Sequence, residues 1–256
     1  MKRTVLITGA TGGIGKAIAE KFAQQGYNIV FDSLDIDGAR IAKEVAEAHH
    51  IEYLYFDTDV SKAAACKQMV SVALEKFGTI DILVNNAGIQ FVCPIDEFPE
   101  EKWDAIIGIN VSAAFYLTKA VWPMMKTNSF GRIINIASAH GLVASKFKSA
   151  YVASKHGLIG LTKTLALEGA EYGITCNAIC PGYVHTAIVE NQIGDQMKAN
   201  QMTRDEVIQK VMLDKQAIKE FITAELIAEA VLFLAQEQAG TITGISLPID
   251  GGWTAQ

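Results

Sequence analysis

The sequence predicts a single doubly wound α/β domain, with a parallel sheet of about seven strands and helices on both faces. Short runs rich in Val and Ile alternate with segments of helical period along the whole chain. These runs are almost continuously apolar, which is typical of strands that are covered on both faces, as in parallel sheets. No linker or internal repeat divides the 256 residues, so we expect one domain over residues 1–256.

The seven expected strands follow one another at intervals that leave room for a helix. They lie at residues 5–7, 28–31, 53–56, 80–84, 132–136, 175–179 and 245–249. The segments between them repeat apolar residues every three or four positions, as in Ile14, Ile18 and Phe22. One longer helix is expected to carry a single stripe made of Trp103, Ile107, Asn110, Ala114, Thr118, Val121 and Met125. This order of elements is that of a doubly wound sheet.

The stretch from about 187 to 219 interrupts the alternation. It is polar, rich in Met and Gln, and contains no obvious strand. It lies between the end of a strand and the last helix, where doubly wound sheets bind ligands. We interpret it as a helical lid over a substrate site, because long insertions in compact domains usually have a function. A solvated helical insertion is the alternative.

Composition restricts the partners. The chain has 22 Lys and Arg against 28 Asp and Glu, a net charge of −6, and no basic cluster, which argues against nucleic acid and anionic membranes. No run approaches the length of about 18 apolar residues that spans a bilayer, and the first apolar run is too short for a signal peptide. Four cysteines form no CxxC pair, as in reducing compartments. We expect a cytoplasmic protein without a catalytic metal, since no His, Cys, Asp or Glu cluster has ligand spacing; a structural metal at the C-terminus stays open.

A glycine-rich turn follows the first expected strand and opens the first helix. It reads Thr8-Gly9-Ala10-Thr11-Gly12-Gly13-Ile14-Gly15. Glycines let the backbone approach a pyrophosphate, and the N-terminus of a helix stabilises its charge. The spacing differs from the common G-x-G-x-x-G, but the position between a strand and a helix indicates a dinucleotide site.

Asp32 ends the second expected strand, where a carboxylate would bind the adenosine ribose of a dinucleotide. Asp35 and Asp37 are alternatives, although such residues usually serve the turn itself. Neither Ser33 nor Leu34 offers a cation to a 2′-phosphate. The sequence therefore favours NAD over NADP.

Ser138, Tyr151 and Lys155 form a second group. Tyr151 and Lys155 are four residues apart, hence on one face of a helix. Ser138 follows the strand at 132–136, at the sheet edge where ligands bind. A tyrosine with a pKa of about 10 is a poor base unless a neighbouring ammonium favours its phenolate. Alone, this Tyr–Lys pair would be an ordinary surface pairing.

Together with further motifs, these residues resemble the short-chain dehydrogenase/reductase family over essentially the whole chain. The matching motifs are Thr8-Gly9-x-x-x-Gly13-x-Gly15, Asn85-Asn86-Ala87-Gly88, Asn110, Ser138, Tyr151-x-x-x-Lys155 and Pro181-Gly182. The resemblance implies that Tyr151 is the acid/base, that Ser138 polarises the substrate oxygen, and that Lys155 lowers the pKa of Tyr151 while binding the nicotinamide ribose. It also implies that Asn110 holds a water in a proton relay.

The same resemblance completes the expected cofactor site. It implies that Asp59 and Val60 contact adenine, and that Val184 and Thr186 hold the carboxamide. The chain departs from the family at Ser33, where NAD-dependent members often carry the acid. The expected NAD-binding residues are Gly9, Thr11, Gly13, Ile14, Gly15, Asp32, Leu34, Asp59, Val60, Asn86, Ala87, Gly88, Tyr151, Lys155, Pro181, Gly182, Val184 and Thr186.

Segments 85–90, 138–141 and 250–256, with Lys148 and Gln192, resemble more closely the bacterial members of this family whose substrate is (R)-3-hydroxybutyrate. They imply a substrate carboxylate bound by Gln90, His140, Lys148 and Gln192, with Trp253 shaping a methyl pocket. A small carboxylate needs several donors, and these side chains provide neutral and cationic ones. The alternatives are solvated loop residues and, for Trp253, an anchor between subunits.

The expected activity is reversible, NAD-dependent oxidation of (R)-3-hydroxybutyrate to acetoacetate, with Tyr151 as acid/base. One alternative is another reductase of the family, acting on 3-oxoacyl or sugar substrates; the carboxylate-binding set argues against it. The other is an NAD(H)-binding redox sensor, which would not need an acid/base. The resemblance also implies a homotetramer, paired through helices at about 101–127 and 151–171.

Overall fold

A seven-stranded parallel sheet forms the centre of the molecule. The computed structural model describes residues 2–255 except 187–188, 191–192, 195–196 and 198–200. The strand order is β3-β2-β1-β4-β5-β6-β7, and every pairing is parallel. The strands are β1 (Thr4–Thr8), β2 (Asn28–Asp32), β3 (Tyr53–Phe56), β4 (Ile82–Asn85), β5 (Gly131–Ile136), β6 (Ile174–Pro181) and β7 (Ser246–Ile249). The predicted doubly wound α/β domain is confirmed.

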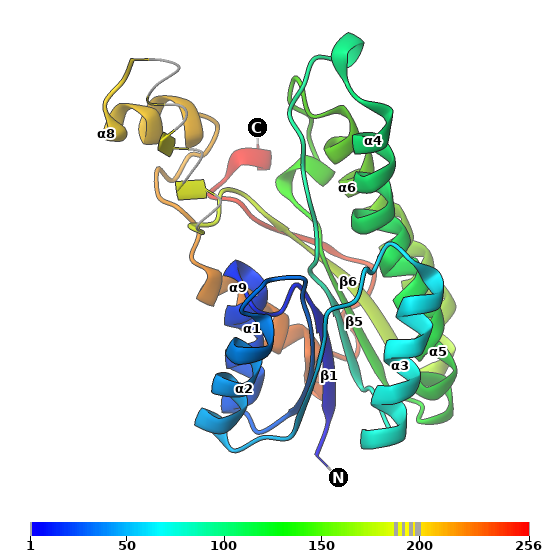
Figure 1. Ribbon diagram of the computed structural model, residues 1–256. Coiled ribbons are helices and arrows are strands. Elements are labelled where there is room, and N and C mark those ends of the chain that lie inside the picture. The colour runs from blue at the N-terminus through cyan, green and yellow to red at the C-terminus, as the bar shows by residue number, and fades with distance from the viewer. Residues whose placement is uncertain (1, 187–188, 191–192, 195–196, 198–200, 256) are drawn as a thin grey trace.

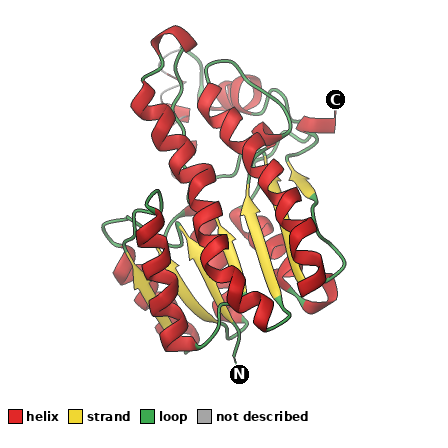
Figure 2. Cartoon of the chain, turned by 90° about the vertical axis from the view of Figure 1, so that its right-hand side faces the viewer, coloured by secondary structure: helices red, strands yellow, loops and turns green. Residues whose placement is uncertain are grey.

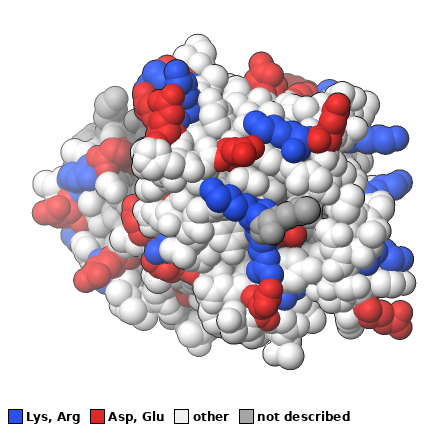
Figure 3. Space-filling model, turned by 90° about the horizontal axis from the view of Figure 1, so that it is seen from below, with Lys and Arg blue, Asp and Glu red and all other residues white. Residues whose placement is uncertain are grey.

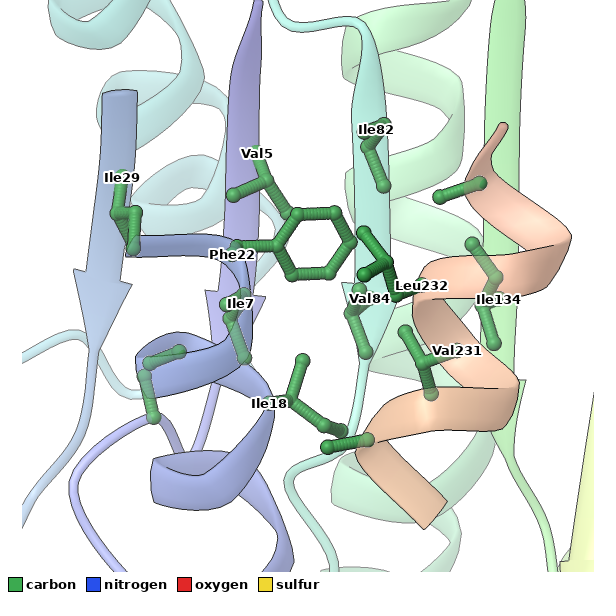
Figure 4. Packing of buried hydrophobic residues seen from close by; sticks show 14 of the residues in the cluster. Val5, Ile7, Ile18, Phe22, Ile29, Ile82, Val84, Ile134, Val231 and Leu232 are labelled. Carbon is green, nitrogen blue, oxygen red and sulfur yellow. The ribbon is translucent and has the colours of Figure 1, made fainter. Parts of the chain in front are cut away.

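Helices cover both faces of this sheet (Figures 1 and 2). One face carries α1 (Gly13–Gln24), α2 (Gly38–His49) and α9 (Ala224–Ala235), and the other carries α3 (Ala63–Phe77), α5 (Ala113–Thr127) and α6 (Ser149–Gly169). Successive strand residues point to opposite faces, so Ile7 packs with Phe22 and Val231 in one cluster (Figure 4), whereas Leu6 belongs to another. Both faces of the inner strands are therefore buried, as their apolar runs indicate, whereas the edge strands β3 and β7 are only partly buried.

The long helix before β5 is interrupted. α4 (Glu100–Ile107) continues through a π-helical turn, Gly108–Ser112, into α5. A π-turn adds a residue per turn and rotates the helix that follows. The predicted stripe is buried from Asn110 to Met125, but Trp103, before this turn, is 40% exposed. Its placement on the stripe is therefore wrong.

The same helical run reaches the length and hydropathy of a membrane-spanning helix. Among the described residues, Glu100–Thr127 alone does so, with a mean hydropathy of 1.3 over its most apolar window, of which 39% is buried in the chain. A core helix passes the same test, and α5 packs on α3 and on β4 and β5. The sequence prediction considered only unbroken apolar runs, and this helix is not one of them.

The described residues between β6 and α9 form a projection at the carboxyl end of the sheet, which we call the projection after β6. It includes α8 (Arg204–Val207) and a π-helical turn, Ile208–Met212, which stand apart from the sheet in Figure 1. Its apolar side chains make a small cluster of their own, including Val189, Ile193 and Leu213. The opposite end of the molecule shows acidic and basic side chains interspersed (Figure 3). The projection therefore lies at the end of the sheet where the strands terminate in their carboxyl ends.

Candidate active site

A cavity of about 1010 Å³ lies at the carboxyl edge of the sheet. Loops after β1, β2, β4, β5 and β6 line it, as expected for a doubly wound sheet. Most of the predicted residues line this one space: Gly9, Gly13, Ile14, Asp32, Leu34, Asp59, Val60, Asn86, Ala87, Gly88, Gln90, Ser138, His140, Lys148, Tyr151, Lys155, Pro181, Gly182, Val184, Thr186 and Trp253. Thr11, Gly15 and Asn110 do not line it, and Gln192 lies outside the described residues.

The glycine-rich turn is shaped by close backbone contacts. Gly9 and Gly13 have φ values of 63° and 47°, a conformation that side chains rarely adopt. A Cβ on Gly15 would lie 1.9 Å from the carbonyl oxygen of Gly9, so only glycine lets α1 begin here. The first turn of α1 carries no acidic residue. The turn therefore offers an anion an open helix N-terminus, which suits a pyrophosphate.

A second motif holds this turn in place. The Thr8 hydroxyl accepts hydrogen bonds from the backbone N–H groups of Asn86 (3.0 Å) and Ala87 (2.9 Å). The Asn86 side-chain amide donates to the carbonyls of Thr8 (2.9 Å) and Gly9 (3.2 Å). The loops after β1 and β4 are thus tied together, and both line the same part of the cavity.

Two carboxyl groups lie near the end of β2. Asp32 is 2% exposed, and its Oδ1 accepts a hydrogen bond from the Thr58 backbone N–H at 3.0 Å. Burial raises the pKa of Asp32 to about 7. Asp35 is exposed, and its Oδ2 lies 2.6 Å from the Thr11 hydroxyl and 2.9 Å from that of Ser33. Asp35 therefore presents a carboxylate beside the glycine-rich turn, whereas Asp32 is a buried anchor for the loop after β3.

Ser138, Tyr151 and Lys155 converge on the cavity from β5 and α6. Lys155 is 4% exposed; its Nζ donates to the Ile136 carbonyl at 2.8 Å and lies 5.7 Å from the centroid of the Tyr151 ring. Burial lowers the pKa of Lys155 to about 8. Burial also raises the pKa of Tyr151, although a hydrogen bond from Ser138 opposes that rise. Burial therefore favours the protonated form of Tyr151.

Asn110 lies in the π-turn between α4 and α5. Its side chain accepts from the Ile89 N–H (2.9 Å) and donates to the Ile89 carbonyl (3.0 Å) and to the Ser154 hydroxyl (3.0 Å). A Cβ on Gly88 would lie 3.4 Å from Asn110 Oδ1 and 3.5 Å from Lys155 Nζ. Asn110 thus fixes the loop after β4 beside Lys155, and its part in a proton relay stays a prediction.

Aromatic rings assemble the end of the cavity at which the sequence predicts the substrate. The His140 ring lies edge-on to those of Tyr151 and Trp253, with centroids 5.9 and 5.0 Å apart. Trp253 stacks on Tyr183 at 5.8 Å with 8° between the ring planes. The His140 Nε2 lies 2.9 Å from the Ser145 hydroxyl. Burial lowers the pKa of His140 to about 4, so this imidazole is neutral near pH 7.

Lys148 adds a cation to this end. It is partly buried, and its Nζ lies 6.0 Å from the centroid of the Tyr183 ring. Burial, followed by the charge of Lys215, lowers its pKa. Gln90 reaches the same cavity from the loop after β4. Sequence reasoning did not single out Lys215 or Ser145; the place of Ser145 in the loop of His140 was the one available signal.

Comparisons with known proteins extend over the whole site. The profile of the short chain dehydrogenase family matches residues 3–197. A D-beta-hydroxybutyrate dehydrogenase of Rhizobium meliloti is 51% identical over 258 residues and covers 100% of both chains. One of Cupriavidus necator is 46% identical over 256 residues, which covers 99% of this chain and 98% of that protein. A solved structure, ElxO with NADP bound, has a TM-score of 0.89 and 29% identity over 100% of both chains.

Proposed function

This chain belongs to the short-chain dehydrogenase/reductase family, and we propose that it catalyses the reversible, NAD-dependent oxidation of (R)-3-hydroxybutyrate to acetoacetate. One observation carries this proposal: a Tyr–Ser–Lys group and a set of carboxylate donors line one cavity with a glycine-rich nucleotide turn. The relatives that are 51% and 46% identical bear the name of this activity. Their similarity over the full chain supports the substrate.

The cavity suits a dinucleotide along its length. The turn at Gly9 and Gly13 would hold the pyrophosphate, Asp59 and Val60 the adenine, and Thr186 the carboxamide. Leu34, Asn86, Ala87, Gly88, Pro181, Gly182 and Val184 would complete the walls. When bound, the nicotinamide supplies the acceptor for the hydride from C3 of the substrate. The protein positions both molecules and moves the proton.

Proton transfer is assigned to Tyr151. Its phenolate oxygen would take the proton of the C3 hydroxyl while Ser138 hydrogen-bonds to the same oxygen. Because burial raises the pKa of Tyr151, the phenolate requires a positive charge nearby. Lys155, whose pKa of about 8 leaves it mostly protonated at pH 7, provides that charge.

The substrate carboxylate is assigned to Lys148, His140 and Gln90, with Gln192 as a further donor. Lys148 supplies the charge, and neutral His140 supplies a hydrogen bond without requiring a second buried cation. Trp253, 6% exposed against His140 and Tyr183, would limit the space for the methyl group. This set favours a small acid over an acyl thioester or a sugar.

We propose NAD as the cofactor, in preference to NADP. The Asp35 carboxylate lies beside the glycine-rich turn, and Ser33 and Leu34 supply no cation there. A 2′-phosphate facing this carboxylate would be repelled and would lose hydration without compensation. ElxO, which was solved with NADP, shares 29% identity with this chain, which leaves room for a different choice.

The lid and the assembly complete the proposal. The projection after β6 packs around its own cluster, which supports the helical lid expected at about 187–219. Of this range, residues 187–188, 191–192, 195–196 and 198–200 lie outside the described part of the chain. Trp103, Phe115 and Leu167 on α4, α5 and α6 are 40%, 45% and 81% exposed, which supports subunit pairing through these helices in a homotetramer. Light scattering of the purified protein tests the proposed tetramer.

Four free cysteines, three of them buried, fit a cytoplasmic location.

Tyr151→Phe tests the assigned chemistry. It removes the oxygen that moves the proton but keeps the ring beside His140, so NADH binding should be preserved. General acid/base catalysis contributes about 10²- to 10⁴-fold, and kcat should fall by that order. A variant that retains more than about a tenth of the wild-type kcat would show that another group moves the proton.

A further inference from the structure

A second, smaller pocket lies beside the substrate end of the main cavity. Its volume is about 200 Å³, and Lys148, Tyr183 and Trp253 line both spaces. Lys215 and Asp214, from the projection after β6, line the smaller one. We call this space the side pocket. The stacked rings of Tyr183 and Trp253 are therefore a wall that the two spaces share.

The backbone that carries Lys215 is firmly held. Leu213 is fully buried and Gln216 is 1% exposed, so buried side chains stand on both sides of Lys215. Gln216 Oε1 accepts from the Tyr183 N–H (3.2 Å), and its Nε2 donates to the Glu220 carbonyl (3.0 Å). The exposed side chain of Lys215 is thereby presented over Trp253, with its Nζ 5.6 Å from the ring centroid.

Basic groups follow one another from the surface into the protein. Lys215 is exposed, Lys148 is partly buried, and His140 is 5% exposed. Ser145 joins the outer and inner groups: its hydroxyl accepts from Lys215 Nζ (3.5 Å) and lies 2.9 Å from His140 Nε2. The charge of Lys215 also contributes to the lowered pKa values of Lys148 and His140. The charge of Lys215 is therefore felt by both Lys148 and His140.

We propose that the side pocket is an entry site for the carboxylate of the substrate, with Lys215 as its outer cation. This inference rests on the proposed function, because it takes the ligand to be a small hydroxy or keto acid. Lys215 attracts the anion at the rim, and Lys148, which lines both spaces, receives it at the main cavity. The step is ion pairing alone. Charges at the rim of a site act mainly on the rate of association. The negative charge of Asp214, beside Lys215, opposes the attraction of the anion.

The test compares neighbouring charge changes of opposite sign. Lys215→Gln should raise the KM for (R)-3-hydroxybutyrate about 1.5- to 5-fold at low salt, the range of an exposed ion pair. Asp214→Asn should lower that KM about twofold, because it removes the opposing charge. Lys210→Gln, which removes a charge from the same projection but outside the side pocket, should leave it unchanged. In all three variants kcat and the KM for NAD⁺ should stay at the wild-type values.

Two further arms separate attraction from a structural effect. The difference between wild type and Lys215→Gln should shrink at about 0.5 M salt, where screening is strong, and Lys215→Arg should behave like wild type. If Lys215 only orients His140 through Ser145, Ser145→Ala will reproduce Lys215→Gln and kcat will fall, which contradicts the inference. A KM raised by both Lys215→Gln and Asp214→Asn, or by neither, also overturns it. Absence of turnover in the wild type would refute the proposed function itself.

Discussion

Lys148 offers a quantitative test of how the substrate is recognised. It is the partly buried cation of the substrate end, in the loop between β5 and α6. A hydrogen bond to a charged group contributes about 1.5–3 kcal/mol, and about 1.4 kcal/mol corresponds to a factor of ten. Lys148→Ala should therefore lower kcat/KM for (R)-3-hydroxybutyrate by about one to two decades. Steady-state NADH formation measures this loss.

Two controls make the result specific. Lys146→Ala removes an exposed lysine from the same loop, outside the cavity lining, and should keep wild-type kinetics. The methyl ester of 3-hydroxybutyrate carries no charge, so Lys148→Ala should use it about as well as the wild type does. The Kd of NADH should not change, since Lys148 is not assigned to the cofactor. Equal losses with acid and ester would refute the assignment of Lys148 to the carboxylate.

Three other changes test the cofactor end of the cavity and the buried acid. Leu34→Arg combined with Asp35→Asn should raise kcat/KM with NADP⁺ relative to NAD⁺ by about tenfold, because a cation replaces a carboxylate; an unchanged ratio contradicts the NAD argument. Gly15→Ala places a Cβ 1.9 Å from the Gly9 carbonyl oxygen, so NADH binding, followed by its fluorescence, should be lost, and normal affinity would contradict the role of this turn. The pKa of Asp32 rises on folding from 3.8 to about 7, so its contribution to stability is lost as pH rises through that range. Asp32→Asn should therefore have a higher free energy of unfolding than wild type at pH 8, by at most about 4 kcal/mol, and nearly the same value at about pH 4. Denaturant unfolding at the two pH values measures this difference, and a variant less stable than wild type at pH 8 would contradict it.

The sheet was predictable from sequence because both faces of its inner strands, from β2 to β6 in the sheet order, are buried. Runs such as residues 5–7 are then apolar throughout and cannot be mistaken for surface segments. The π-turn at Gly108–Ser112 was not predictable, because one extra residue per turn leaves the apolar spacing nearly unchanged. Trp103 was misplaced for that reason.

The candidate site was predictable where residues are close along the chain or belong to a motif. The stacking of Trp253 on Tyr183 and the hydrogen bond from Tyr183 to Gln216 join distant segments, and no local pattern marks such contacts. The sequence favours Asp32 over Asp35 as the ribose ligand, but it does not indicate that Asp32 is buried and that Asp35 is exposed beside the glycine-rich turn. Their different roles depend on Thr58 and Thr11, which come from other loops.

The most direct test of the account is NADH formation by the wild-type protein with the two enantiomers of 3-hydroxybutyrate. In the proposed site, Lys148, His140 and Gln90 would hold the carboxylate and Tyr151 the C3 hydroxyl, so only one enantiomer would direct its C3 hydrogen to the cofactor. With NAD⁺, we expect absorbance at 340 nm to rise with the (R) acid and not with the (S) acid. No NADH from either acid, together with NADPH-dependent reduction of a 3-oxoacyl thioester, would contradict the account.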